Sequence, residues 1–229
     1  TNLSSQSASY GATAIDFNND GKTDLLVARD DGVWLHTNNG GSFSSTKISY
    51  TSNDSEAPMN IAVADIDLDG DIDLYLSNFI AYKSWVSSTF NKPDHVAPNR
   101  LLRNDGNMNF TDITKESGTA GSQNTFFSVF TDLDQDGYQD LVLSNNTGKL
   151  EILHNERNEK FTLNKFDSGI GYWMGIGVGD YDGDGDLDMV VANVETNPFF
   201  FQNNTIDKSS PRSSNNNWLK IKLEGTISN

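Results

Sequence analysis

The chain repeats one nine-residue acidic segment four times in the same frame. The copies are DFNNDGKTD, DIDLDGDID, DLDQDGYQD and DYDGDGDLD, and they begin at Asp16, Asp65, Asp132 and Asp180. Positions 1, 3, 5 and 9 are Asp or Asn in every copy, and position 6 is glycine. Two carboxylates about 4 Å apart, at an effective dielectric of about 20, repel each other by roughly 4 kcal/mol. A tight turn of this composition therefore needs a cation, and alternating oxygen donors around a glycine turn suit Ca²⁺.

The acidic residues are concentrated in these four segments. The net charge is −16, and the segments hold 3, 5, 4 and 5 acidic residues, more than half of the 32 in the chain. The chain has no basic patch, so nucleic acid is excluded as a partner. The absence of cysteine excludes thiol chemistry and disulfides, which leaves metal-filled loops as the available cross-links. No apolar run is long enough to span a membrane.

The spacing of the segments predicts a repeat architecture. They recur at intervals of 49, 67 and 48 residues, and a period of about 50 residues is typical of propeller blades. In each repeat, β-rich runs flank the acidic segment, a third such run ends at a recurring Asn, and a fourth follows a turn. The sequence therefore predicts an all-β fold, a β-propeller built of four-stranded blades, with the long middle interval explained by an insert at residues 79–99.

The sequence also predicts a division of the chain into three parts. Residues 1–203 form the blades, and residues 204–217 form a polar linker. In residues 218–229, Leu219, Ile221 and Leu223 alternate with polar residues and predict a strand. That strand either opens a further module or closes the last blade.

A helical calcium loop is the main alternative for the acidic segments. An EF-hand requires Glu at position 12, but that position is Val27, Leu76, Leu143 and Val191 here, inside strand-like sequence. The helical alternative is therefore rejected.

The four repeats resemble FG-GAP or VCBS repeats, the calcium-bearing blades also found in integrin α-subunit propellers. The phrases PNRLLRNDGNMNFTDIT and NNWLKIKLEGTISN are similar to the cartilage acidic protein family, in which an ASPIC/UnbV module follows the propeller. Propellers of these families usually have more than four blades. The resemblance implies about four Ca²⁺ ions, one per repeat, each held by side chains at positions 1, 3, 5 and 9 and by the backbone carbonyl at position 7. The implied ligands are Asp16, Asn18, Asp20, Lys22 and Asp24; Asp65, Asp67, Asp69, Asp71 and Asp73; Asp132, Asp134, Asp136, Tyr138 and Asp140; and Asp180, Asp182, Asp184, Asp186 and Asp188.

Aromatic residues and histidines outside the segments are the other candidates for function. The insert carries Tyr82, Trp85 and Phe90, which either form a binding loop or pack as a lid on the neighbouring blade. Phe126, Phe127, Tyr172 and Trp173 favour packing between blades over a sugar platform. His36 and His154 are interpreted as repeat surface, and His95 beside Asp94 is weak evidence for a general base.

We expect a non-enzymatic, extracellular calcium-binding propeller that is secreted or displayed at the cell surface, because weak carboxylate loops fill where calcium is roughly millimolar. Its role would be adhesion, matrix or filament assembly, with a protein or glycan partner or with further copies of itself. The alternative is the propeller of a carbohydrate-binding or polysaccharide-acting protein, a lectin or lyase. No constellation of catalytic residues is visible in the sequence.

Overall fold

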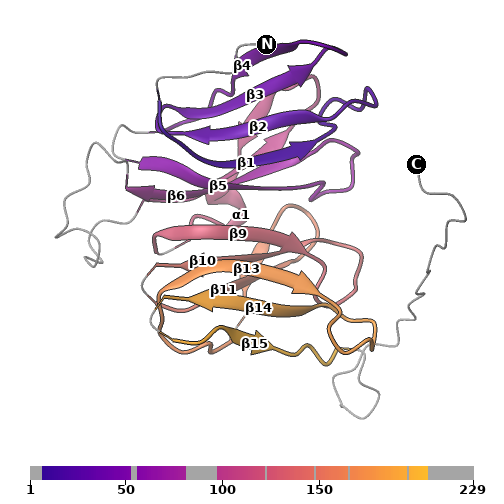
Figure 1. Cartoon of the computed structure of the whole chain (residues 1–229). Helices are drawn as coiled ribbons and strands as arrows, with labels where there is room; N and C mark the ends of the chain where they lie inside the picture. The colour runs from indigo at the N-terminus through magenta and orange to yellow at the C-terminus, as the bar shows by residue number, and fades with distance from the viewer. Residues whose placement is uncertain are drawn as a thin grey trace, which may run out of the picture.

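The computed structural model describes residues 7–52, 56–80, 97–121, 123–146, 148–164, 166–194 and 196–205. Within this part of the chain, antiparallel strands form four separate sheets, which confirms the all-β architecture of blades. The sheets are stacked in chain order, from indigo to yellow in Figure 1. Blade one contains β1 (Ser9–Ile15), β2 (Asp24–Arg29), β3 (Gly32–Asn38) and β4 (Phe43–Lys47); blade two contains β5 (Glu56–Ala64), β6 (Asp73–Ile80), β7 (Arg100–Asn104) and β8 (Phe110–Asp112); blade three contains β9 (Thr125–Thr131), β10 (Asp140–Asn145), β11 (Glu151–Asn155) and β12 (Phe161–Leu163); and blade four contains β13 (Trp173–Gly179), β14 (Asp188–Asn193) and β15 (Phe199–Phe201).

The acidic segment joins the first two strands of each blade in one fixed register. In every blade, the residue before the segment pairs with the last Asp of the segment: Ile15 with Asp24, Ala64 with Asp73, Thr131 with Asp140, and Gly179 with Asp188. Side chains alternate between the two faces of a strand, so a shift of one residue would turn the apolar residues away from the core. The frame that the four segments share in the sequence therefore corresponds to the same strand register in all four blades.

The second strand of each of the two middle blades packs on both faces. In β6, Leu74 and Leu76 belong to the core between blades one and two, whereas Tyr75 belongs to the core between blades two and three. In β10, Leu141 points toward blade two and Val142 toward blade four. A continuous apolar run is what a strand buried between two sheets requires.

Blade four has three strands in the part of the chain that the structure describes. Its face toward blade three is buried, and Trp173 there is 1% exposed and donates its Nε1 hydrogen to the carbonyl oxygen of Gly148 at 3.0 Å. On the opposite face Val190 and Phe200 are 45% and 47% exposed. The packing role that the sequence favoured for Trp173 therefore agrees with the structure.

The structure differs from the sequence-based expectation around the insert. Strand β6 continues to Ile80, and Phe79 is buried and stacks on Phe126 with ring centroids 4.8 Å apart. Asn99 is also buried, and its Oδ1 accepts the backbone N–H of Asn78. The ends of the expected insert at residues 79–99 therefore belong to blade two. Its aromatic residues Tyr82, Trp85 and Phe90, with His95, lie outside the described residues, as do residues 206–229.

One short helix, α1 (Thr114–Ser117), follows β8 and ends at Gly118, whose φ is 80°. A single turn is too short to produce a period of 3.6 in the sequence, which explains why no helix was expected. None of the helices in the described part of the chain has the length and apolar character needed to cross a membrane.

Candidate metal sites

Each acidic segment forms a compact loop that turns twice through the left-handed region. Position 4 has a φ of 57°, 63°, 59° and 78° in the four loops, at Asn19, Leu68, Gln135 and Gly183. Position 6 has a φ between 82° and 98° and is always glycine, because residues with a Cβ rarely adopt this conformation. The glycine at position 6 is therefore required by the backbone of the loop.

The Asp at position 1 is fixed by backbone hydrogen bonds. In the first three loops its two carboxylate oxygens accept the N–H groups of positions 5 and 6 at 2.8–3.1 Å. In the fourth loop, where position 4 is also glycine, Asp180 accepts the N–H of Gly183 at 2.7 Å. Positions 3 and 5 accept the N–H groups two residues further on, in all four loops. The carboxylates thus point inward, toward the centre of each turn.

The Asp at position 9 is buried in every loop, with 1–2% of its surface exposed. One of its oxygens accepts the N–H of position 2, and the other accepts the N–H of the recurring Asn at the end of the third strand. For Asp73 these bonds are 2.9 Å to Ile66 and 2.8 Å to Asn104. The same pair of bonds recurs at Asp24, Asp140 and Asp188. Position 9 therefore ties the loop to the third strand.

Three of the four loops bring three carboxylates within reach of one ion. In these groups every ligand atom lies within 4.8 Å of the others, and the groups are Asp65, Asp67 and Asp73; Asp132, Asp134 and Asp136; and Asp180, Asp182 and Asp188. In the first loop position 3 is Asn18, so that loop has one carboxylate fewer. Among the described residues, position 5 belongs to such a group only in the third loop. Lys22, Asp71, Tyr138 and Asp186 at position 7 each donate their backbone N–H to the carboxylate at position 5.

The donor set fits a hard divalent cation. All the converging side-chain atoms of these groups are carboxylate oxygens, which Ca²⁺ prefers. Burial raises the pKa of Asp73 to about 7 and also raises the pKa of Asp67, Asp134 and Asp140. A cation in the loop would offset this cost of burying ionised carboxylates.

The raised pKa values predict how the metal-free protein responds to pH. Between pH 3.8 and about 7 the folded chain keeps a proton on Asp73 that the unfolded chain has released. The free energy of unfolding of the metal-free protein therefore falls as the pH rises through this window. In EDTA we expect a higher melting temperature at about pH 5 than at about pH 7.5, measured by scanning calorimetry. A higher melting temperature at about pH 7.5 than at about pH 5 would show that burial does not disfavour the ionised form of these carboxylates.

Contacts between loops join neighbouring blades. The Nδ2 of Asn19 donates to the carbonyl oxygen of Gly70 in the next loop at 3.3 Å, and the Nε2 of Gln135 donates to that of Gly185 at 2.6 Å. The recurring Asn residues also bridge blades, because the Nδ2 of Asn155 donates to the carbonyl oxygen of Ile66 at 3.2 Å. The conformation of each loop is therefore stabilised by hydrogen bonds to the adjacent blade.

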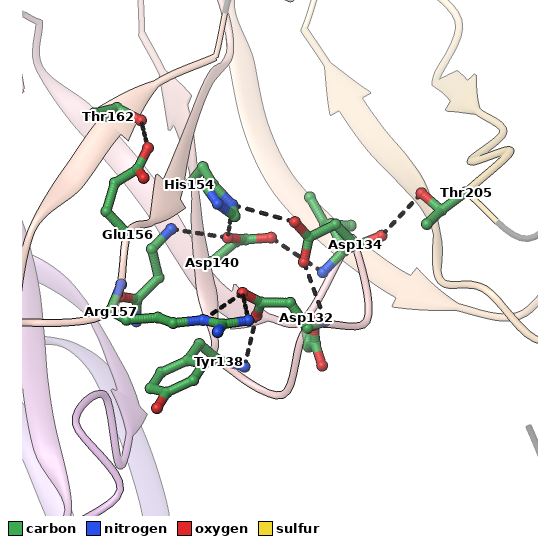
Figure 2. Close-up of polar contacts among 12 residues, drawn as sticks. Asp132, Asp134, Tyr138, Asp140, His154, Glu156, Arg157, Thr162 and Thr205 are labelled. Atoms are coloured by element: carbon green, nitrogen blue, oxygen red, sulfur yellow. Dashed lines mark hydrogen bonds and ion pairs between the residues drawn. The ribbon is translucent and has the colours of Figure 1, made fainter. Parts of the chain in front are cut away.

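The third loop has two further neighbours that sequence reasoning missed. The Nδ1 of His154 lies 3.0 Å from Oδ1 of Asp140 and 3.5 Å from Oδ2 of Asp134, as Figure 2 shows. Arg157 bonds Oδ2 of Asp136 at 3.0 Å and stacks over the ring of Tyr138. Burial of the imidazole opposes its charge, but the two carboxylates outweigh burial and raise the pKa of His154. The sequence feature that could have revealed the contact of His154 with the loop is its position directly before a recurring Asn.

The two histidines interpreted as equivalent surface residues are neither equivalent nor both at the surface. His154 precedes its recurring Asn by one residue and His36 precedes Asn38 by two, so their side chains leave opposite faces of the third strand. His36 is 2% exposed and contacts Ser45 Oγ at 2.7 Å and Arg29 Nη2 at 3.2 Å. Burial, with the nearby Arg29 charge, lowers the pKa of His36.

One family model and one solved structure agree with this architecture. A lectin of Agrocybe aegerita, described in terms of specific recognition of non-reducing terminal N-acetylglucosamine, matches with a TM-score of 0.51 and 18% identity over 84% of this chain and 50% of that chain. The structure of BBS1N in complex with ARL6DN matches at a TM-score of 0.37 and 10% identity, over 84% of this chain and 63% of that one. The chain thus spans half the length of the lectin, and no curated protein matches it. The family model for the FG-GAP-like repeat matches residues 16–76 and 132–191, which is more than half of the chain. The chain belongs to the family of FG-GAP-like repeat proteins.

Proposed function

We propose that the chain is a non-enzymatic propeller segment in which each of the four loops binds one structural Ca²⁺ ion. The observation that carries this proposal is the convergence of three carboxylates in three of the four loops, always including positions 1 and 3, in a frame that all four blades share. The ion would neutralise the loop and hold the first two strands of the blade together. Because only the folded chain presents the complete loop, binding would stabilise the fold.

The proposed setting is extracellular, where calcium at roughly millimolar concentration fills weak carboxylate loops. There the rigid blades would present loops to a protein or glycan partner in adhesion, matrix or filament assembly. The similarity to integrin α-subunit propellers and to the cartilage acidic protein family supports this setting. The ASPIC/UnbV-like part of that similarity, residues 218–229, lies outside the described residues.

Calcium titration tests the proposal. We expect isothermal titration of EDTA-treated, dialysed protein to give about four sites, with the first loop as the weakest because Asn18 makes it one charge poorer. The variant Asn18→Asp should strengthen that site and leave the other three unchanged. A first loop that fills before the others, or a chain that binds no Ca²⁺, would contradict the proposal.

Glycan binding is the second candidate function. It is favoured by two exposed aromatic rings, Tyr181 at position 2 of the fourth loop and Phe200 on β15. They are 75% and 47% exposed, and their ring centroids are 4.5 Å apart. Aromatic faces of this kind can stack on sugar rings, and the fold is shared with a lectin. A glycan array probed with the wild-type chain and with Tyr181→Ala tests this candidate. Signals that are absent, or unchanged in the variant, would reject this surface as a glycan site.

A further inference from the structure

The third loop contains a nitrogen donor that the repeat frame does not include. His154 comes from strand β11, outside the acidic segment, and its Nδ1 faces Asp134 and Asp140 at 3.5 and 3.0 Å. One ligand atom from each of these three residues lies within 4.8 Å of the other two. Around an ion with bonds of about 2.1 Å, tetrahedral ligands stand about 3.4 Å apart, so this group already has nearly the spacing of a metal site.

The equivalent residue differs in the other blades. The residue before the recurring Asn is Thr37 in blade one, Arg103 in blade two and Gln202 in blade four. Arg103 turns away from its own loop and bonds Asp105 and Glu159. Gln202 donates its Nε2 hydrogen to Oδ2 of Asp182 at 2.6 Å. The residue before the recurring Asn therefore faces position 3 of the loop in blades three and four. Of these two residues, only His154 in blade three has an imidazole that can bind a metal.

The group opens into a cavity between blades three and four. The cavity has a volume of about 540 Å³, and its lining includes Asp134, Asp140 and His154 on one side and Met189, Phe201 and Gln202 on the other. An ion held by the three side chains would thus have room for water or a small ligand in its remaining coordination positions. Figure 2 shows the imidazole directed at both carboxylates, with Thr205 approaching from the side of blade four.

We propose that Asp134, Asp140 and His154 form a site for a transition-metal divalent cation of the zinc class, so that the third loop differs in metal selectivity from the other three. Imidazole is a preferred ligand of Zn²⁺, Co²⁺ and Ni²⁺, whereas Ca²⁺ is bound by oxygen donors. Two carboxylates and one imidazole match the three protein ligands of an open zinc site. This inference rests on the proposed role of the loops as metal sites.

The first experiment titrates Zn²⁺ into the full, metal-free chain and into His154→Gln. Glutamine can keep the hydrogen bond to the carboxylates, as Gln202 does in blade four, while it removes the nitrogen ligand. We expect one tight Zn²⁺ site in the wild type and a loss of affinity of roughly 10- to 100-fold in the variant. His95→Gln is the matched control and should bind Zn²⁺ as the wild type does.

The second experiment transfers the site to blade four. The double variant His154→Gln/Gln202→His is designed to place an imidazole beside Asp182, which already groups with Asp180 and Asp188. We expect this variant to regain one tight Zn²⁺ site, and Gln202→His alone to bind two. Calcium-loaded samples of all variants should melt as the wild type does, which verifies folding.

Equal Zn²⁺ affinity of the wild type and His154→Gln would overturn the inference, and so would a wild type without a tight Zn²⁺ site. The calcium titration separates this failure from failure of the proposed function. A chain that binds four Ca²⁺ but shows no dependence of Zn²⁺ binding on His154 contradicts only the inference. A chain that binds Zn²⁺ through His154 but no Ca²⁺ contradicts only the proposed calcium role.

Discussion

Removing calcium with EDTA should lower the melting temperature of this protein by about 10 °C or more. A ligand that binds only the folded state stabilises it by RT ln(1 + [L]/Kd), which is roughly 1.4 kcal/mol for each site at ten times its Kd. Four such sites would give about 6 kcal/mol, and each kcal/mol shifts the melting temperature by roughly 2–4 °C in a domain of this size. Scanning calorimetry in millimolar Ca²⁺ and in EDTA measures the difference.

Two controls make this result specific. Re-addition of Ca²⁺ should restore the melting temperature, whereas an equal concentration of Mg²⁺ should restore much less of it, because Mg²⁺ demands octahedral geometry and dehydrates reluctantly. The variant Asn18→Asp should widen the gap between the two conditions. A melting temperature that is the same in EDTA and in Ca²⁺ would exclude a structural role for metal in the loops.

The substitution Asp73→Ala should destabilise the calcium-loaded protein by about 4 kcal/mol, because it leaves two buried N–H groups without an acceptor. Those groups belong to Ile66 and Asn104, which bond the carboxylate at 2.9 and 2.8 Å. Both residues are almost completely buried, so water cannot replace the lost acceptor. Urea unfolding at about pH 7.5 in millimolar Ca²⁺ measures the loss.

The matched control is Asp71→Ala in the same loop. The side chain of Asp71 is partly exposed and stands at position 7, where the frame uses the backbone alone. We expect a change of less than about 1 kcal/mol for this variant. In EDTA the cost of Asp73→Ala should shrink, because burial of the ionised carboxylate is then unfavourable and the pKa of Asp73 is raised to about 7. Equal losses for the two variants in Ca²⁺ would contradict the role assigned to position 9.

The predicted strands and their sheets are confirmed because both depend on local periodicity. Strand β6 has an apolar run around Leu74, and strand β10 has one around Val142. Each run can be recognised directly in the sequence, because a strand between two sheets must be apolar on both faces. The loop frame is local as well, since its turns need glycine at position 6. The assignment of the loop residues as calcium ligands stays a prediction.

Contacts that depend on how strands pair could not be predicted in this way. His154 reaches the third loop from a strand that follows it in the chain, and only the pairing of β10 with β11 brings the imidazole to Asp140. The burial of His36 likewise depends on which face of β3 its side chain occupies.

The sequence by itself determined the repeat, the strands and the acidic frame, because each is set by interactions within a few residues. The tertiary structure alone decided that position 9 fastens the loop to the third strand, that loops bond across blades, and that one loop gains an imidazole. These features join residues that are 14 or more positions apart in the chain, and their distances depend on strand register and on the stacking of sheets.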